Sequence, residues 1–349
     1  MGGAETVVRL RPTARRGRGL DTQVIAITDQ GTSHPFVSQL CALGVPVTIR
    51  RPMGRRYLAE VDGIAEVVRN LGIEVLHTHV YRADFIGYFA ARKTGAAAVS
   101  TFHGETGGGW LNRFYEWSAK RLFKRFDAVV CVSRTNQEKL RAAGSNLTNS
   151  HLVPNGAGFE DLLDRDAARQ ALGLARADTA IGWIGRLSEE KGPDLMLRAF
   201  ETLNDAELRL IFIGDGSMRD ELEARAASMG TRVRFAGAIP SASQLLKAFD
   251  VVAMSSRMEG MPMVMLEAMA ARVPVVGFLV GGIPEVLSDQ TGWPVPADDV
   301  AGLAGALAMA LREGAAAAER SAAAQALVRR DYGVASWVDA VEAVYAAAL

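Results

Sequence analysis

The sequence is poor in cysteine and in long apolar runs. Its 349 residues include only two cysteines, Cys41 and Cys131, so neither a disulfide framework nor a cysteine-based metal cluster is expected. No apolar run is long enough to span a bilayer, and we expect no secretion leader. These absences favour a protein of the reducing cytoplasm.

The chain also lacks a net charge, with 39 basic and 39 acidic residues, but the charges are unevenly distributed. Residues 1–157 carry 21 basic and 12 acidic residues, a net charge of +9, and the remainder carries −9. This asymmetry fits two parts with different tasks, or two parts that complement each other across a cleft. We expect no nucleic-acid partner.

What the chain does contain is a repeated alternation of strand and helix patterns. One series fills residues 1–157, a second fills 158–331, and a final amphipathic helix follows in 332–349. Such alternation predicts an α/β protein with two doubly wound parallel sheets, helices on both faces, and ligands at the carboxyl ends of strands.

The stretch 255–277 combines a loop, an apolar helix and a buried strand. Pro262 occupies a favourable position for a helix start, and Glu259 precedes it, where backbone N–H groups stabilise anions. Glu267 lies within the apolar helix, where a carboxylate needs a partner. The two carboxylates therefore flank a predicted phosphate site.

Two cations follow a predicted strand in the same half of the chain. Arg186 and Lys191, at a strand-to-helix turn, could together neutralise a diphosphate. Further along, Gly281 and Gly282 would permit a close backbone approach to a ligand. Glu285, just after them, could accept hydrogen bonds from a ligand or cap a helix, and the sequence leaves both interpretations open.

These segments together resemble a known family. The second half contains GRLSEEKG (185–192), IFIGDG (211–216), FAGAI (235–239), SSRMEGMPMVMLEAMAARVPVV (255–276), GGIPEVL (281–287) and TGWPV (291–295). The first half contains GGAE (2–5), VLHTH (75–79), TFHG (101–104), VCVS (130–133) and VPNG (153–156). In order and spacing they are similar to retaining family 4 glycosyltransferases, which implies the GT-B fold: two Rossmann-like domains facing across a cleft.

The resemblance implies a role for each matching residue. Domain 1–157 would bind the acceptor, domain 158–331 would bind the nucleotide sugar, and helix 332–349 would cross back to the first domain. Arg186 and Lys191 would bind the diphosphate, Glu267 the ribose hydroxyls, and Glu259 the donor sugar. The remaining expected donor-site residues are Gly2, Gly3, Gly260, Met261, Pro262, Met263, Gly281 and Gly282.

The expected acceptor side involves histidines. His103 would lie near the anomeric carbon, and we expect it to be catalytic together with Glu259 and the two cations. Because His77 and His79 alternate along a strand, we expect them on opposite faces, with one, taken to be His79, near the acceptor and neither able to share a metal. No metal or other cofactor is expected, since cations and helix N-termini offset the leaving charge.

Two features leave alternatives open. The basic, aromatic helix 110–126 could lie on an anionic membrane surface, or it could be a core helix with a solvated basic face. The family pattern also begins with a strand before its Gly-Gly turn, whereas this sequence begins at the turn. We expect either an upstream start or an impaired first domain.

The resemblance therefore implies a metal-independent retaining hexosyltransferase. It would move a sugar from a UDP- or GDP-sugar to a glycan or lipid-linked acceptor in bacterial envelope, lipopolysaccharide or exopolysaccharide synthesis. It would work in the cytoplasm or peripherally on the inner face of the membrane. The alternatives are a GT-B-fold nucleotide-sugar epimerase and a non-catalytic nucleotide-sugar-binding relative.

Overall fold

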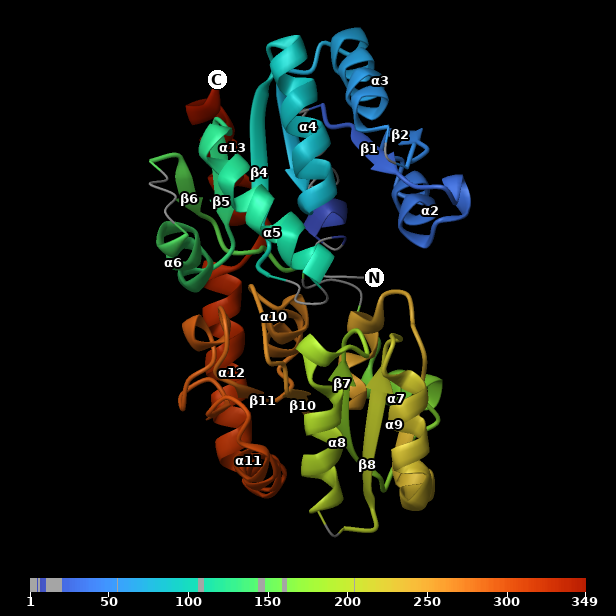
Figure 1. Ribbon diagram of the computed structural model, residues 1–349. Helices are drawn as coiled ribbons and strands as arrows, with labels where there is room; N and C mark the ends of the chain where they lie inside the picture. The colour runs from blue at the N-terminus through green and yellow to red at the C-terminus, as the bar shows by residue number, and fades with distance from the viewer. Residues whose placement is uncertain are drawn as a thin grey trace. The chain divides into compact units, whose positions relative to one another are not determined.

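A computed structural model describes residues 5, 7–10, 21–54, 56–105, 110–143, 148–158, 162–203 and 205–349, with only the backbone of 110–115. The chain forms two compact units, each of which is described by itself (Figure 1). One unit comprises Ala4–Gly156 together with Val334–Leu349 and is called the histidine unit below. The other comprises Ala157–Gly333 and is called the carboxylate unit.

The histidine unit contains two parallel sheets. The strands β1 (Val24–Ile27) and β2 (Val47–Arg50) form a pair, and four further strands form a sheet in the order β3-β4-β5-β6. These four are β3 (Val75–His79), β4 (Ala97–Phe102), β5 (Ala128–Cys131) and β6 (Ser150–Leu152). The helices are α2 (Pro35–Ala42), α3 (Tyr57–Asn70), α4 (Tyr81–Thr94), α5 (Trp110–Leu122), α6 (Arg134–Ala142) and α13 (Val334–Ala348), with short 3-10 helices η1 (Gly31–Ser33) and η2 (Phe123–Arg125).

The carboxylate unit contains one six-stranded parallel sheet in the order β12-β11-β10-β7-β8-β9. Its strands are β7 (Thr179–Ile184), β8 (Leu208–Ile213), β9 (Val233–Phe235), β10 (Val251–Met254), β11 (Val275–Phe278) and β12 (Trp293–Val295). Its α-helices are α7 (Arg165–Ala171), α8 (Pro193–Glu201), α9 (Arg219–Ala226), α10 (Met263–Ala270), α11 (Val300–Arg312) and α12 (Gly314–Asp331). The 3-10 helices are η3 (Glu189–Lys191), η4 (Ala227–Arg232), η5 (Ala242–Ala248) and η6 (Ile283–Glu285).

Burial follows directly from the parallel arrangement. Strands covered by helices on both faces need apolar side chains on both, and every residue of β4, β5, β10 and β11 is buried. In the view of Figure 1, α8 and α9 are drawn on either side of β8. The predicted α/β class, with two parallel sheet systems, is confirmed.

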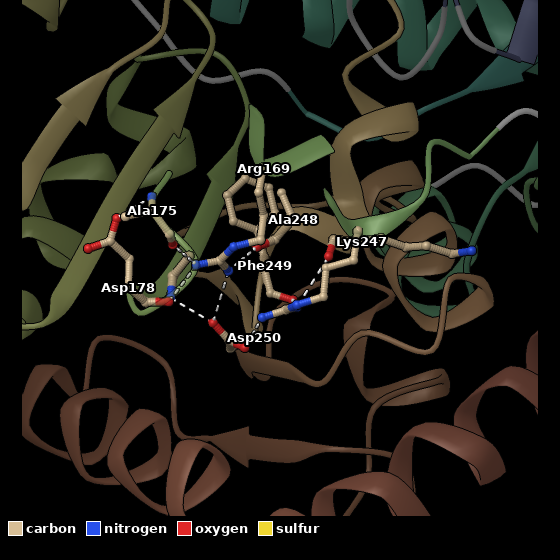
Figure 2. A network of polar contacts seen from close by, with 9 residues as sticks. Arg169, Ala175, Asp178, Lys247, Ala248, Phe249 and Asp250 are labelled. Atoms are coloured by element: carbon tan, nitrogen blue, oxygen red, sulfur yellow. Dashed lines mark hydrogen bonds and ion pairs between the residues drawn. The ribbon is translucent and has the colours of Figure 1, made fainter. Parts of the chain in front are cut away.

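A buried arginine ties the first helix of the carboxylate unit to the strand ends (Figure 2). Arg169, on α7, is buried, and only 4% of the residue is exposed. Its guanidinium donates hydrogen bonds to the carbonyl oxygens of Ala175 (2.6 Å), Asp178 (2.6 Å) and Ala248 (3.0 Å). The Asp250 carboxylate lies 3.7 Å away. Hydrogen bonding and a nearby countercharge offset the desolvation of this cation.

Several predicted elements differ from those observed. Helix α7 was not predicted from the sequence, and residues 242–249, whose sequence pattern favours an α-helix, contain the 3-10 helix η5 instead. The sequence pattern favours one helix over 217–229, but the structure divides this stretch between α9 and η4, and Gly230 within η4 has a non-helical φ of 55°. Pro262 is the N-cap of α10 rather than its first residue.

Among the described residues, no single helix is long and apolar enough to cross a membrane. The pair α11 and α12 passes that test only together, with a bend of 101° between them.

Candidate functional site

The carboxyl ends of β7 and β8 are held in close contact by backbone groups. The N–H of Gly185 donates to the carbonyl of Ile213 (3.0 Å), and that of Leu187 donates to Asp215 (3.0 Å). Gly214 has φ of 145°, and a Cβ there would lie 1.8 Å from the carbonyl oxygen of Gly185. The glycine is therefore required for the loop that carries Arg186 to leave the strand at this point.

Lys191 and Glu259 meet at this edge of the sheet although they are distant in sequence. The ammonium Nζ lies 2.8 Å from both carboxylate oxygens of Glu259. Ser256 donates a third hydrogen bond to the same carboxylate at 2.7 Å. The Glu259 side chain is 5% exposed and the Lys191 side chain 27% exposed, so the pair is largely shielded but reachable from one side.

Arg186 lies in the same loop and is more open. Its side chain is 58% exposed, and its guanidinium is 3.7 Å from the carboxylate of Glu190. Glu190 is also held by the Ser188 hydroxyl, at 2.7 Å. A loosely paired, exposed arginine can exchange its partner for a phosphate at little free-energy cost.

The loop that carries Glu259 is fixed by a second ion pair that the sequence analysis did not single out. Arg257 donates two hydrogen bonds to the Asp194 carboxylate (2.8 and 2.7 Å) and one to the carbonyl of Glu189 (2.8 Å). This forked pairing holds the pKa of Asp194 below its usual value, because the charge and hydrogen bonds of Arg257 outweigh the effect of burial. The arginine in the motif SSRMEG (255–260) was the sequence signal that could have indicated this ion pair.

Gly281 and Gly282 allow two loops to touch. Gly281 has φ of +57°, and a Cβ would lie 1.9 Å from the carbonyl oxygen of Glu259. The Gly282 N–H donates to the carbonyl of Gly260 at 2.7 Å. The two glycines thus let the backbone approach the loop 259–260 closely, and this contact holds the loop beside Lys191.

Helix α10 begins directly after this loop. Met261, Pro262 and Met263 are buried, and Glu267 is half-buried within a helix whose other residues are mostly buried and apolar. Except for the two N-terminal glycines, the residues expected to bind the donor therefore occupy the loops after β7, β10 and β11 and the helix α10, all in one unit. Gly2 and Gly3 lie outside the described residues.

The histidine unit brings three imidazole rings together. His79 Nδ1 lies 2.8 Å from His103 Nε2, with the ring centroids 5.1 Å apart and the planes 30° apart, so the two rings meet edge to edge. The rings of His77 and His79 stack, with centroids 4.7 Å apart and planes within 10°. The expectation that His77 and His79 face opposite sides is wrong: side chains alternate with a period of two, so residues two apart share a face.

Burial shifts the pKa values of two groups in this unit. It lowers the pKa of His103 to about 4, because the imidazolium is disfavoured away from water. On the opposite face of the same strands, Asp84 is 1% exposed, and burial raises its pKa to about 7. The hydroxyls of Thr78 (2.6 Å) and Ser100 (2.7 Å) donate to its carboxyl group and join β3, β4 and α4.

No group of three or more His, Cys, Asp or Glu within the described ranges has the arrangement needed to hold a metal ion. The polar groups of the candidate site are therefore an exposed cation, a shielded ion pair and a helix start in one unit, and a cluster of three imidazoles, of which His103 is neutral, in the other. The first set suits an anionic ligand, and the second suits hydroxyl groups.

Comparison with known proteins places this geometry in a family. The model for Glycosyltransferase Family 4 matches residues 1–159, and the model for Glycosyl transferases group 1 matches 178–313. The D-inositol 3-phosphate glycosyltransferase of Xylanimonas cellulosilytica is 31% identical over 300 residues, which are 76% of this chain and 70% of that protein. The phosphatidyl-myo-inositol mannosyltransferase of Mycobacterium leprae is 26% identical over 94% of this chain and 89% of its own length.

Solved structures agree on the fold. The HepE protein of Anabaena, crystallised with UDP and glucose, matches with a TM-score of 0.87 at 22% identity, covering 99% of this chain and 96% of that one. Sucrose-phosphate synthase from Thermosynechococcus elongatus matches with a TM-score of 0.83 at 20% identity, covering 99% and 93%. The chain belongs to glycosyltransferase family 4, within the glycosyl transferases group 1, and is a glycosyltransferase of the GT-B fold.

Proposed function

We propose that the protein transfers a hexose from a UDP- or GDP-sugar to a glycan or lipid-linked acceptor, with retention of anomeric configuration and without a metal ion. The observation that carries the proposal is the pairing of Lys191 with Glu259 at the carboxyl edge of the sheet, beside Arg186. These groups converge where parallel α/β sheets bind their ligands.

The charges suit the leaving group of such a reaction. When the bond between the anomeric carbon and the donor phosphate breaks, negative charge accumulates on the nucleoside diphosphate. Arg186 and Lys191 would stabilise that charge, which is the form of electrostatic assistance with the largest effect on rate. Glu259 would orient the ammonium group and contact the donor sugar, and Glu267 would accept hydrogen bonds from the ribose hydroxyls.

The acceptor class rests on the relatives. Besides the inositol and phosphatidylinositol enzymes, a lipopolysaccharide core biosynthesis mannosyltransferase of Rhizobium meliloti is 29% identical over 66% of this chain and 68% of its own length. The names of these proteins support a lipid or glycan acceptor in bacterial envelope synthesis. His103 would lie on the acceptor side, where a neutral imidazole can hydrogen-bond a sugar hydroxyl.

A lipid-linked acceptor would bring the protein to the inner face of the membrane. Helix α5 and the turn after it combine core packing with an outward basic surface: Phe123 and Phe126 are buried, while Trp117 is 52% exposed with Arg121 stacked 3.7 Å from its ring centre. We expect cosedimentation with vesicles containing anionic lipid at low salt, weakened by added salt. No sedimentation at low salt would contradict this part of the proposal.

The test of the donor site is a thermal-shift panel of UDP- and GDP-sugars. A ligand that binds the folded state raises the melting temperature by mass action, and Glu267→Ala should abolish the shift for the preferred donor. The exposed carboxylate of Glu221, on α9, provides the control, and Glu221→Ala should leave the shift intact. An unchanged shift in Glu267→Ala, or no shift with any donor, would contradict the assignment.

The alternatives are separated by products. A transferase forms a glycosylated acceptor, an epimerase releases a sugar product in the absence of acceptor, and a non-catalytic relative shows a thermal shift without transfer or hydrolysis. Product analysis of the stabilising donor, incubated with and without candidate acceptors, distinguishes the three.

A further inference from the structure

The starting observation is that His103 is held by another imidazole and not by a charged group. Its Nε2 atom is engaged with His79 Nδ1 at 2.8 Å. Because burial keeps His103 neutral, one ring must donate an N–H and the other must accept it. The contact therefore couples the proton positions of the two rings: His103 either donates from Nε2, or accepts there and carries its proton on Nδ1.

His79 is itself held on one face and at one edge. One face of its ring stacks on His77, with planes 10° apart, and its Nδ1 edge meets His103 Nε2 at 2.8 Å, with the two ring planes 30° apart. His77 is fixed at both nitrogens, by the Tyr345 hydroxyl (2.7 Å) and the Thr101 hydroxyl (2.7 Å). The position of His79 is thus determined by a rigid partner.

We propose that His79 is a positioning residue for His103: it occupies Nε2, selects one neutral tautomer, and turns Nδ1 of His103 toward a hydroxyl of the sugar or acceptor. This inference rests on the proposed function for the substrate but not for the link between the two histidines. His79 acts through His103, because its Nδ1 is engaged by His103 and one face of its ring is covered by His77.

The backbone around the cluster supports a fixed geometry. His103 follows β4 directly, and the next residue, Gly104, accepts a hydrogen bond at its carbonyl from the Tyr81 hydroxyl at 3.0 Å. The carbonyl of Phe102 accepts a longer hydrogen bond from Asn136, at 3.4 Å. With the chain held on both sides of His103, its remaining freedom is rotation of the side chain and choice of tautomer, and His79 limits both.

The first readout does not depend on turnover. Protein labelled with 15N-histidine contains only five histidines, and single His→Asn variants assign their ring signals. We expect His103 to show one neutral tautomer in the wild type and a mixture in His79→Leu. His79→Asn, whose amide can occupy the position of Nδ1, should restore a single tautomer. Unchanged His103 signals in a folded His79→Leu protein would overturn the inference.

The second readout is kinetic. We expect His79→Leu to lower kcat by about 10- to 100-fold with the donor KM within a few-fold, because a misplaced group loses transition-state contacts. His79→Asn should recover most of this loss. In a His103→Ala background, His79→Leu should have no further effect. Multiplicative effects of the two substitutions would show that His79 acts independently and would overturn the proposal.

The two hypotheses fail differently. If the NMR result holds but no donor is turned over by the wild type, the proposed function fails and the link between the histidines stands. If the wild type transfers sugar and His79→Leu retains full kcat, the proposed function stands and the positioning role fails.

Discussion

The groups singled out in the two compact units differ in charge. The carboxylate unit pairs formal charges, Lys191 with Glu259 and Arg186 with Glu190. The histidine unit instead buries neutral groups, with His103 uncharged and Asp84 protonated up to about pH 7. Ion pairs at the edge of a sheet can exchange partners with a phosphate, whereas a desolvated neutral cluster selects by hydrogen-bond direction. We therefore expect substitutions in the carboxylate unit to act mainly through lost charge, and substitutions in the histidine unit to act mainly through altered hydrogen-bond geometry.

The largest effect should come from removing a charge in the carboxylate unit. We expect Lys191→Met to reduce kcat/KM for sugar transfer by about 10²- to 10³-fold, as for loss of one donor to a developing anion. The exposed Lys247 of the same unit provides the control, and Lys247→Met should retain full activity. Steady-state kinetics on both variants makes the comparison.

Loss of Lys191 also leaves the carboxylate of Glu259 shielded without its cation, which destabilises the fold. A double variant, Lys191→Met with Glu259→Gln, should recover melting temperature without recovering activity. If activity returned with stability, Lys191 would be structural and the charged character assigned to this site would be wrong.

The carboxylate unit was the more predictable of the two. Its site residues lie in contiguous motifs at strand ends, so the sequence placed Arg186, Glu259 and Gly281 on the correct loops. It did not predict that Lys191 and Glu259 form an ion pair, because contacts between segments so distant in sequence depend on strand order. The fold class followed from the alternation of elements, while short 3-10 helices and α7 did not, since brief helices have weak periodicity.

The histidine unit was harder to predict. VLHTH was correctly identified as a strand that ends at the site, but misassigning the faces separated His77 from His79. The hydrogen bond from Tyr345 to His77 could not be predicted from the sequence. The two residues meet only because the C-terminal helix packs on β4 and β5. Tertiary contacts of this kind leave no local signal in a sequence.

Two glycines of the carboxylate unit, Gly281 and Gly305, differ in the space around them. Gly281→Ala places a Cβ 1.9 Å from the Glu259 carbonyl at a positive φ, so we expect a loss of about 3 kcal/mol or more in unfolding free energy. Gly305, inside α11, has nothing within 4 Å of the position that a Cβ would take, and Gly305→Ala should stabilise by about 0.5–1 kcal/mol. Urea unfolding of both variants tests this, and a tolerated Gly281→Ala would show that the two loops can separate.

The protonated, neutral state of Asp84 in the histidine unit can be tested by varying the pH. Asp84 has a folded pKa of about 7, above its usual 3.8, so between these values the folded protein retains a proton that the unfolded chain has lost. Stability from this group is therefore lost as pH rises through that window, by about 1.4 kcal/mol per pH unit. Asp84→Asn cannot titrate, so relative to the wild type it should gain about 2 kcal/mol between about pH 5.5 and pH 7.

Urea unfolding of wild type and Asp84→Asn across this pH range makes the measurement, and the difference between the two curves removes the contribution of other carboxylates. Parallel curves would mean that Asp84 is charged in the folded state, and the contrast between the two units would fail at this residue.

The smallest effect should come from the outermost hydroxyl of the histidine cluster. Tyr345→Phe removes the 2.7 Å hydrogen bond to His77 Nδ1 and keeps the aromatic packing, in which the two rings meet edge to face with centroids 5.6 Å apart. We expect a loss of about 1 kcal/mol in unfolding free energy and a decrease of only a few-fold in kcat, because Thr101 still holds the other nitrogen of His77. Combining Tyr345→Phe with Thr101→Val should produce a larger fall in kcat than the product of the single effects, since His77 then loses both anchors and the stack on His79 can rotate. Strictly multiplicative effects would indicate that the orientation of His77 does not reach His103, and the neutral cluster would then be two separate contacts instead of one unit.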